Sequence, residues 1–515
     1  MNGAESLVRT LVAGGVDVCF TNPGTSEMHF VAALDSIAGM RCVLGLFEGV
    51  VTGAADGYYR MTDKPAATLL HLGPGLGNGL ANLHNAKKAQ SGIVNIVGEH
   101  AREHVKYNAP LTSDIEGIAR PMSHWVRTAV SSESVAADGA AAIHAARRSP
   151  GQIATLILPA DTAWNTASSV ASVAPDEALA QPNAAAVQAA ARALSQGSKA
   201  MLLLGGRALR GGALELAGRI AAKTGCTLSA ENGNARLQRG AGRVTLSRVP
   251  YVVEAAVSYL KEVQQLVLVG SRVPVSFFAY PNKPSVQIAP DCQVTELAAV
   301  NADLEASLQA LAEELGATNM APTLLANGAR PQLPSGALTQ EGIAAVLGAL
   351  LPEQAIVVDE SVSTGRGFAK FTENAAPHDW LNVMGGAIGF GLPQSVGAAI
   401  AAPDRKVITL EGDGSGMYTL QALWTMARES LDVTVLVFAN RTYQILRGEL
   451  ANVGAGEPGK RANDMLTLDR PTLDWVSLAK GHGVEAARVT DLEGLATQMK
   501  RAMARPGPYL IEVVL

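Results

Sequence analysis

Apolar runs of strand length alternate with amphipathic, helix-length stretches along most of the chain, which predicts an α/β fold with parallel sheets. In the first third of the chain, strands are expected at VDVCFT (16–21), CVLGLF (42–47), AATLLHL (66–72), IVNIVG (93–98) and ATLILP (154–159). Later runs of the same kind are AMLLLGG (200–206), TLSAEN (227–232), QLVLVGS (265–271), SVQIAP (285–290), AIVVDES (355–361), VITLEGDG (407–414), VTVLVFAN (433–440) and YLIEVVL (509–515).

Two stretches interrupt this alternation. Residues 163–186 and 317–337 are rich in Ser, Ala and Pro and are interpreted as linkers. They divide the chain into three doubly wound, parallel-sheet α/β domains, expected at 1–165, 185–320 and 338–515. Such sheets bind ligands at the carboxyl ends of their strands, so chemistry is sought there.

Composition narrows the class of protein. The 515 residues are 48% apolar and 17% charged, with a net charge of −5 and no basic patch, which disfavours a nucleic-acid partner. The longest apolar run falls short of the roughly 18 residues of a membrane span. The four cysteines are scattered, without zinc spacing or a disulfide framework. The N-terminus lacks a signal-peptide pattern, so a cytoplasmic protein is expected.

The stretch LEGDGSG (410–416) places an acid inside a Gly-rich turn after a predicted strand. Asn440 follows the next predicted strand, 27 positions after Asp413, which is the length of one helix (about 417–431) and one return strand. A right-handed crossover brings both side chains to one sheet edge. A carboxylate and an amide oxygen suit Mg²⁺, with phosphate oxygens completing its shell. The backbone N–H groups of Gly414 and Ser415 are candidates to bind that phosphate. The alternative is an ordinary capped strand–helix turn.

This motif resembles the thiamine-diphosphate (ThDP) and magnesium motif of the acetolactate synthase, pyruvate decarboxylase and benzoylformate decarboxylase family. The resemblance covers the whole chain and implies a pyrimidine-binding domain, a middle Rossmann-like domain and a diphosphate-binding domain, in that order. It implies Asp413, Asn440 and the Thr442 carbonyl as metal ligands. It adds cofactor contacts at Gly386, Ile388, Gly412, Gly414, Ser415 and Tyr443. Within GGAIGFGLPQSVGAAI (385–400), the Gly386 carbonyl would accept from the aminopyrimidine, and Ile388 would bend the cofactor. The alternative for Ile388 is a core residue.

A second signature is FEGVVTGAADGYYR (47–60), in which Glu48 begins a helix rich in small residues. Standing alone, such a glutamate would face water. In the family, the matching carboxyl exchanges a proton with N1′ of the aminopyrimidine, so that the cofactor's amino group can act as a base. The matching glutamate serves the cofactor held by another subunit. The resemblance therefore implies a homodimer or homotetramer with active sites at the subunit interface.

The expected substrate pocket is drawn from three segments. His71, at the end of a predicted strand, matches a histidine of benzoylformate decarboxylase and would relay protons or bind the substrate carboxylate. Its alternative is a histidine satisfied by the backbone of a turn. Thr25 matches a substrate-binding serine, with Ser26 and His29 nearby, although His29 also fits a packed helix residue. Ile445 and Leu446 would form an apolar wall, and Leu446 replaces the catalytic acid of pyruvate decarboxylases.

The segment VPVSFFAYP (273–281) offers Phe277 and Phe278 where benzoylformate decarboxylase has a second catalytic histidine. The expected function is therefore acetolactate synthase-like decarboxylation or carboligation of a 2-oxo acid. Alternatives are a benzoylformate decarboxylase-like lyase or aldehyde lyase, a flavin- or nicotinamide-dependent oxidoreductase, and a catalytically silent homologue. The Gly-rich turn LLLGGRALRGG (202–212) leaves FAD possible but is weak support on its own.

Overall fold

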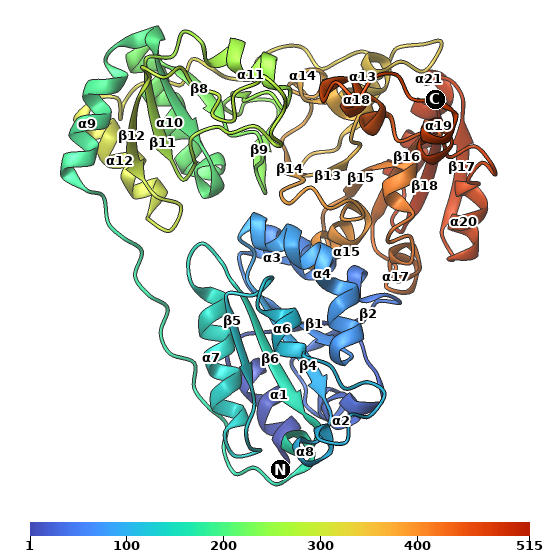
Figure 1. The fold of residues 1–515 in the computed structure, drawn as a ribbon. Coiled ribbons are helices and arrows are strands. Elements are labelled where there is room, and N and C mark those ends of the chain that lie inside the picture. Colours follow the sequence, from blue (N-terminus) through green and yellow to red (C-terminus); the bar gives the residue numbers. More distant parts are fainter.

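The computed structural model describes residues 1–515 and contains three sheets, as Figure 1 shows. The first sheet has the order β2-β1-β3-β4-β6-β5, and all its neighbouring strands are parallel. Its strands are β1 (Val18–Asn22), β2 (Arg41–Leu44), β3 (Ala66–Leu70), β4 (Ile93–Glu99), β5 (Trp125–Thr128) and β6 (Ile153–Pro159). Its helices are α1 (Gly3–Ala13), 3₁₀ turn η1 (Thr25–Glu27), α2 (Met28–Ser36), α3 (Glu48–Thr62), α4 (Leu72–Ala89), α5 (Arg102–Val105), α6 (Ile115–Ala119), α7 (Val135–Arg147) and α8 (Ala160–Trp164).

The second sheet is also parallel throughout, with the order β10-β8-β7-β11-β12. Its strands are β7 (Ala200–Leu204), β8 (Thr227–Ala230), β10 (Ser247–Arg248), β11 (Gln265–Val269) and β12 (Gln293–Ala298). Its helices are α9 (Ala184–Leu194), η2 (Gly197–Lys199), η3 (Gly206–Leu209), α10 (Gly211–Thr224), α11 (Val253–Leu260) and α12 (Leu304–Glu314).

The third sheet has the order β17-β18-β16-β15-β13-β14-β9 and is parallel except where β9 runs against β14. Its strands are β9 (Leu237–Arg239), β13 (Ile356–Glu360), β14 (His378–Asn382), β15 (Val407–Gly412), β16 (Val433–Ala439), β17 (Glu485–Val489) and β18 (Tyr509–Val514). Its helices are α13 (Gln340–Leu350), η4 (Thr364–Gly367), α14 (Phe368–Phe371), α15 (Gly391–Ala401), α16 (Asp413–Gly416), α17 (Ala422–Arg428), α18 (Gln444–Asn452), α19 (Lys460–Leu466), α20 (Trp475–Gly481) and α21 (Leu492–Met503).

The predicted fold class is confirmed, and several element predictions need correction. Residues 285–290 form no strand. The fifth strand of the middle sheet is instead Gln293–Ala298. This edge strand is half exposed and has no continuous apolar run, so the apolar pattern did not predict it. Of the helix expected at about 417–431, only α17 (Ala422–Arg428) forms, and the short α16 (Asp413–Gly416) precedes the expected span. The chain from 165 to 183 and from 315 to 339 contains no helix or strand, in keeping with two linkers, and the domain boundaries remain predictions.

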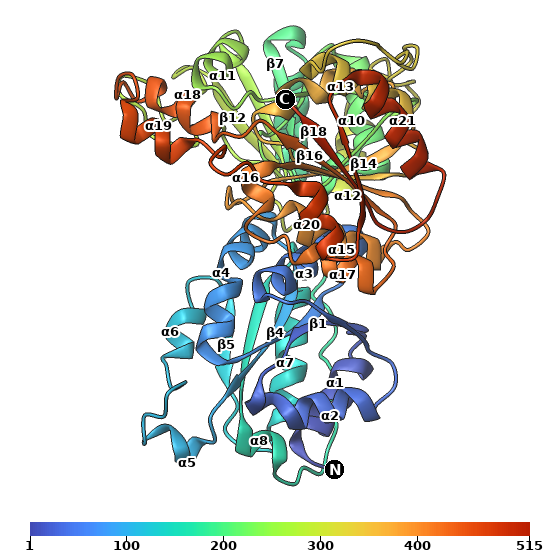
Figure 2. The same ribbon diagram turned by 90° about the vertical axis from the view of Figure 1, so that its right-hand side faces the viewer.

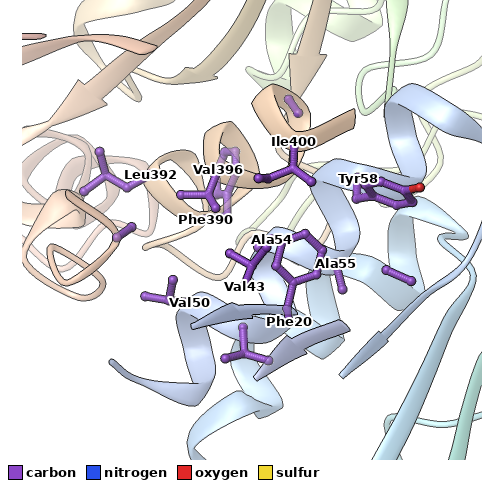
Figure 3. Packing of buried hydrophobic residues seen from close by; sticks show 14 of the residues in the cluster. Phe20, Val43, Val50, Ala54, Ala55, Tyr58, Phe390, Leu392, Val396 and Ile400 are labelled. Carbon is purple, nitrogen blue, oxygen red and sulfur yellow. The ribbon is translucent and has the colours of Figure 1, made fainter. Parts of the chain in front are cut away.

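The first and third domains share one hydrophobic core through the crossing of α3 over α15, which Figure 3 shows from close by. The crossing depends on small residues: a Cβ atom on Gly57 would lie 2.2 Å from the Gln394 carbonyl oxygen, and one on Gly397 would lie 1.9 Å from that of Ala54. A buried ion pair joins Arg60 to Asp56 at 2.8 Å, and Arg60 also donates to the Asn382 carbonyl at 2.7 Å. The two domains are therefore held in a fixed relation.

None of the helices combines the length and the apolar character needed to cross a membrane.

Candidate active site

The carboxyl edge of the first sheet brings two chain segments together. β1 and β3 are parallel neighbours with Asn22 opposite Leu70, so the turn after β1 lies beside His71. There the Nδ1 atom of His71 lies 2.9 Å from Oε2 of Glu27, whose side chain is 1% exposed. Glu27 also accepts the Gly24 N–H at 2.8 Å and the Ser26 hydroxyl. A buried carboxylate thus fixes the orientation of the partly exposed imidazole.

Two glycines leave the space in which this pair sits. A Cβ atom on Gly24 would lie 2.0 Å from Nδ1 of His71, and one on Gly98 would lie 1.7 Å from Oε1 of Glu27. Gly98 lies on β4, the strand next to β3 in the sheet. Any larger residue at either position would displace the imidazole or the carboxylate.

Glu48 is the first residue of α3 and is buried, with Oε2 accepting from Nδ2 of Asn78 at 2.9 Å. A Cβ atom on Gly75 would lie 3.1 Å from Oε1 of Glu48 and 3.3 Å from Cβ of His71. Glu48 and His71 therefore flank the same glycine of α4 and belong to one half of the site. The water-facing alternative for Glu48 does not describe this structure.

Two other predicted pocket residues lie close to this half-site in the chain. Thr25 is exposed at the start of η1, directly before Ser26 and Glu27. His29 is exposed on α2, and its ring centroid lies 6.0 Å from that of Trp164 on α8. No hydrogen bond joins His29 to the Glu27–His71 pair. The substrate roles of Thr25, Ser26 and His29 remain predictions.

The carboxyl edge of the third sheet brings Asp413 and Asn440 together, because β15 and β16 are parallel neighbours with Gly412 opposite Phe438. Asp413 accepts the Gly414 N–H at 2.9 Å and, across the strands, the Arg441 N–H at 2.7 Å. Arg441 adopts a left-handed conformation with φ of 57°, and the Thr442 N–H then donates to Oδ1 of Asn440 at 3.1 Å. Two neighbouring turns, one after each strand, thus bring Asp413 close to Asn440 and Thr442.

The chemistry of this turn fits a hard cation. Asp413 is 4% exposed and makes no ion pair, and burial raises the pKa of its carboxyl. A buried carboxylate without a cationic partner is costly unless a cation joins it. The available donors are a carboxylate, an amide oxygen and a backbone carbonyl, which are the ligand types that Mg²⁺ takes.

Two buried acids that the sequence analysis did not single out lie behind the cofactor segments. Glu360 accepts the N–H groups of Gly389, at 2.6 Å, and of Gly391. Glu411 accepts a hydrogen bond from the Ser415 hydroxyl at 3.0 Å, so the Ser415 side chain points into the domain. Burial raises the pKa of both carboxyls, that of Glu360 to about 8, and the neighbouring Glu360 raises the pKa of Glu411 further. These acids tie the segment 385–391 to the Gly-Asp-Gly turn.

The segment 385–391 is also held by α4. Nδ2 of Asn85 donates to the Ala387 carbonyl at 2.8 Å, and Nδ2 of Asn82 donates to that of Gly389 at 3.1 Å. Gly386 has φ of 81°, which favours glycine. Ile388 is partly exposed and belongs to none of the buried apolar clusters, so the core alternative does not apply to it.

Aromatic side chains from the middle domain lie over this segment. A Cβ atom on Gly386 would lie 2.7 Å from Cζ of Phe277, and the Phe277 and Phe278 rings meet edge to face with centroids 4.8 Å apart. Phe278 is 54% exposed, and Leu446 on α18 is 45% exposed, whereas Ile445 is partly buried. Phe277 therefore lies beside the predicted cofactor segment, and its neighbour Phe278 is an exposed apolar group.

In the middle domain, the space beside the Gly-rich turn, where a dinucleotide site would hold phosphate, contains a side chain of the protein. A Cβ atom on Gly205 would lie 2.5 Å from Oε1 of Glu231, at the end of β8. Burial raises the pKa of Glu231 to about 7. A carboxyl group fills the space beside this turn, so the structure adds no support for FAD.

The sequence reasoning missed Glu27, Asn78, Glu360 and the contacts of Asn82 and Asn85. Glu27 had one usable signal, because TSE follows a predicted strand whose neighbour ends at His71. Glu360 ends the apolar run AIVVDES, and an acid there is unusual. Asn82 and Asn85 gave no local signal, because their partners Gly389 and Ala387 lie 307 and 302 positions away.

Comparison with known proteins decides the family. The N-terminal TPP binding domain model of thiamine pyrophosphate enzymes matches residues 1–120, and the C-terminal TPP binding domain model matches residues 363–513. The chain belongs to the thiamine pyrophosphate enzyme family. The first matched region contains Glu48 and His71, and the second contains Asp413 and Asn440. The chain is thus a ThDP-dependent enzyme of the acetolactate synthase and 2-oxo-acid decarboxylase type.

Individual relatives cover the whole chain. A Mycobacterium tuberculosis (H37Rv) protein, provisionally named acetolactate synthase large subunit IlvX, is 53% identical over 100% of this chain and 99% of its own length. Benzoylformate decarboxylase of Pseudomonas aeruginosa is 30% identical over 97% of this chain and 96% of its own length. The solved structure of the Rhodococcus jostii RHA1 thiamine diphosphate-dependent 4-hydroxybenzoylformate decarboxylase matches with a TM-score of 0.87 and 26% identity, covering 99% of this chain and 98% of that chain.

Proposed function

We propose that this enzyme uses ThDP and Mg²⁺ to decarboxylate a 2-oxo acid with an apolar side chain, and that an aldehyde or a second oxo acid can capture the product-forming carbon. The single observation that carries this proposal is that the Glu27–His71 pair, whose Glu27 carboxylate is buried, lies with Glu48 around Gly75. This arrangement supports the proposal, because His71 as a proton donor and acceptor would then lie beside the carboxyl group that would activate the cofactor.

The cofactor would be held by the third domain. Asp413, Asn440 and the Thr442 carbonyl would bind Mg²⁺, and the N–H groups of Gly414 and Ser415 would bind the diphosphate. The Gly386 carbonyl, Ile388, Gly412 and Tyr443 would contact the rest of the cofactor. When bound, ThDP would supply the carbon nucleophile for the 2-oxo group and the electron sink needed for loss of CO₂.

The chain's own residues then have separable tasks. Glu48 exchanges a proton with the aminopyrimidine ring, with Asn78 fixing its carboxyl group. His71, oriented by Glu27, binds the substrate carboxylate or delivers a proton to the reacting carbon. Phe278, Ile445 and Leu446 contact the apolar side chain, with Thr25, Ser26 and His29 at the opposite wall.

We propose a homodimer as the minimum active unit, with a tetramer as an extension of it. Within one chain, no hydrogen bond or ion pair connects Glu48 or His71 with Asp413, Asn440 or Thr442. The exposed pair Phe277 and Phe278 supports burial against another copy, because contiguous exposed apolar groups mark interaction sites.

A panel of 2-oxo acids tests the reaction. Pyruvate, a branched-chain oxo acid and benzoylformate would be offered with ThDP and Mg²⁺, with and without an acceptor aldehyde, while CO₂ and coupled products are measured. CO₂ release that requires both cofactors supports the proposal, and the acceptor arm separates decarboxylase from carboligase activity. Failure of every 2-oxo acid in both arms would overturn it.

A further inference from the structure

The guanidinium of Arg447, on α18, joins the predicted metal turn to two distant side chains. Its Nε atom donates to Oγ1 of Thr442 at 2.8 Å, and Nη2 donates to Oγ1 of Thr467 at 2.8 Å. Nη1 donates to Oδ1 of Asn463, on α19. Arg447 makes no ion pair with a carboxylate, so its planar set of donors is used to connect neutral oxygens.

The helices that Arg447 connects contribute no buried residue to a hydrophobic core. Neither α18 nor α19 contains a buried residue, and both project from the side of the third domain in Figure 2. The chain after α19 returns to the turn through backbone bonds, with Tyr443 N–H donating to the Leu466 carbonyl at 2.9 Å and Leu468 N–H to the Arg441 carbonyl at 2.7 Å. The segment 444–466 is therefore anchored by polar contacts that converge on residues 441–443.

The Thr442 hydroxyl is the centre of this anchor, because it accepts from Arg447 and donates to the Leu466 carbonyl at 2.8 Å. The next residue touches the Gly-Asp-Gly turn: a Cβ atom on Gly414 would lie 2.5 Å from Cε1 of Tyr443. A rotation of the Thr442 peptide would therefore move the Thr442 carbonyl and would also shift Tyr443, which contacts the turn at Gly414.

We propose that Arg447 is a positioning residue for the Mg²⁺ site, which aims the Thr442 carbonyl and couples cation binding to the order of α18 and α19. This inference rests on the proposed function, since it takes Thr442 as a metal ligand. Residues that orient a metal's ligands change its affinity by about 10–100-fold when they are removed.

Titration of Mg²⁺ into the full-length protein saturated with ThDP tests the inference. Arg447→Ala is expected to weaken Mg²⁺ binding by about 10–100-fold. Arg461→Ala is the matched control, because Arg461 is exposed on α19 and its side chain makes no hydrogen bond or ion pair; the Mg²⁺ affinity of this variant should equal that of the wild type. Thermal unfolding of the cofactor-free variants checks that both chains fold.

A second variant tests the route through Thr442. Thr442→Val keeps the backbone carbonyl and the branched shape but removes the hydroxyl that Arg447 holds. It should weaken Mg²⁺ binding as Arg447→Ala does, and the double variant should be no weaker than the worse single variant, because both remove one interaction. Amide hydrogen exchange over 444–466 should slow on adding Mg²⁺ and ThDP to the wild type and stay fast in both variants.

The outcomes separate this inference from the proposed function. If the wild type binds Mg²⁺ and ThDP but Arg447→Ala binds Mg²⁺ within about two-fold of it, the inference is wrong and the function stands. If the wild type binds neither cofactor, both are overturned. Additive losses in the double variant would also contradict the coupling through Thr442.

Discussion

Nδ1 of His71 lies 2.9 Å from the buried carboxylate of Glu27, although 44 residues separate them in the chain. The contact fixes which ring nitrogen faces the pocket, because one nitrogen is engaged by the carboxylate. Because the Glu27 side chain is only 1% exposed, we expect it to act through His71.

Removing either member of this pair is expected to slow turnover. His71→Ala should lower kcat by about 10²–10⁴-fold, the usual contribution of a positioned acid or base. Glu27→Gln should lower kcat by a smaller factor, and the double variant should match His71→Ala alone. Glu103→Gln, an exposed change in the same domain, is the control. Additive effects of the two variants would show that Glu27 acts independently of His71.

The aromatic pair Phe277 and Phe278 should set substrate preference. Phe278→Ala is expected to lower kcat/KM for benzoylformate by about 10–100-fold, the value of a lost apolar contact of this size, with a smaller effect on pyruvate. The ratio of the two kcat/KM values is the measurement. Equal losses for both substrates would mean that Phe278 does not contact the substrate side chain.

The crossing of α3 and α15 should tolerate no added methyl group. Gly397→Ala places a Cβ atom 1.9 Å from the Ala54 carbonyl, so the helices must separate, and overpacking of this kind costs about 1–3 kcal/mol or more. The midpoint of thermal unfolding should fall. Gly481→Ala, where a Cβ atom would meet nothing within 4 Å, is the matched control and should leave the midpoint close to that of the wild type.

The metal-binding half of the predicted site could be found from the sequence, because its residues follow strands that the apolar pattern reveals. The runs VITL and VTVLVF are almost wholly apolar, which predicts buried parallel strands, and the crossover rule then predicts that Asp413 lies near Asn440. The strand HDWLN could not be found this way. It is fully buried with His378 and Asp379 inside, and Asp379 is neutralised by Arg236 and Arg405 from elsewhere in the chain.

The same limit applies to the site. Glu48, Asp413 and Asn440 lie within local motifs that the sequence displays. Glu27 and Glu360 owe their burial to partners far along the chain, His71 in one case and Gly389 and Gly391 in the other. Local pattern cannot report a pairing that only the tertiary fold creates.

Stability should fall with rising pH because of Glu231. Burial raises its pKa from the ordinary 4.5 to about 7, so between these values the folded chain holds a proton that the unfolded chain has released. The contribution of Glu231 to the free energy of unfolding is fully present below pH 4.5 and is lost as the pH rises toward 7. The loss is no more than ~1.4 kcal/mol per pH unit. Glu231→Gln should flatten the pH dependence of urea unfolding over this range. An unchanged slope would contradict the assignment.

The central claim is that this chain performs ThDP chemistry on 2-oxo acids with Glu48 as the activating carboxyl. The most direct measurement is CO₂ release from the best 2-oxo acid by the wild type and by Glu48→Gln, with ThDP and Mg²⁺ binding measured on the same samples. We expect Glu48→Gln to lose at least about 10²-fold in turnover while still binding ThDP and Mg²⁺. Undiminished CO₂ release by Glu48→Gln would contradict the account.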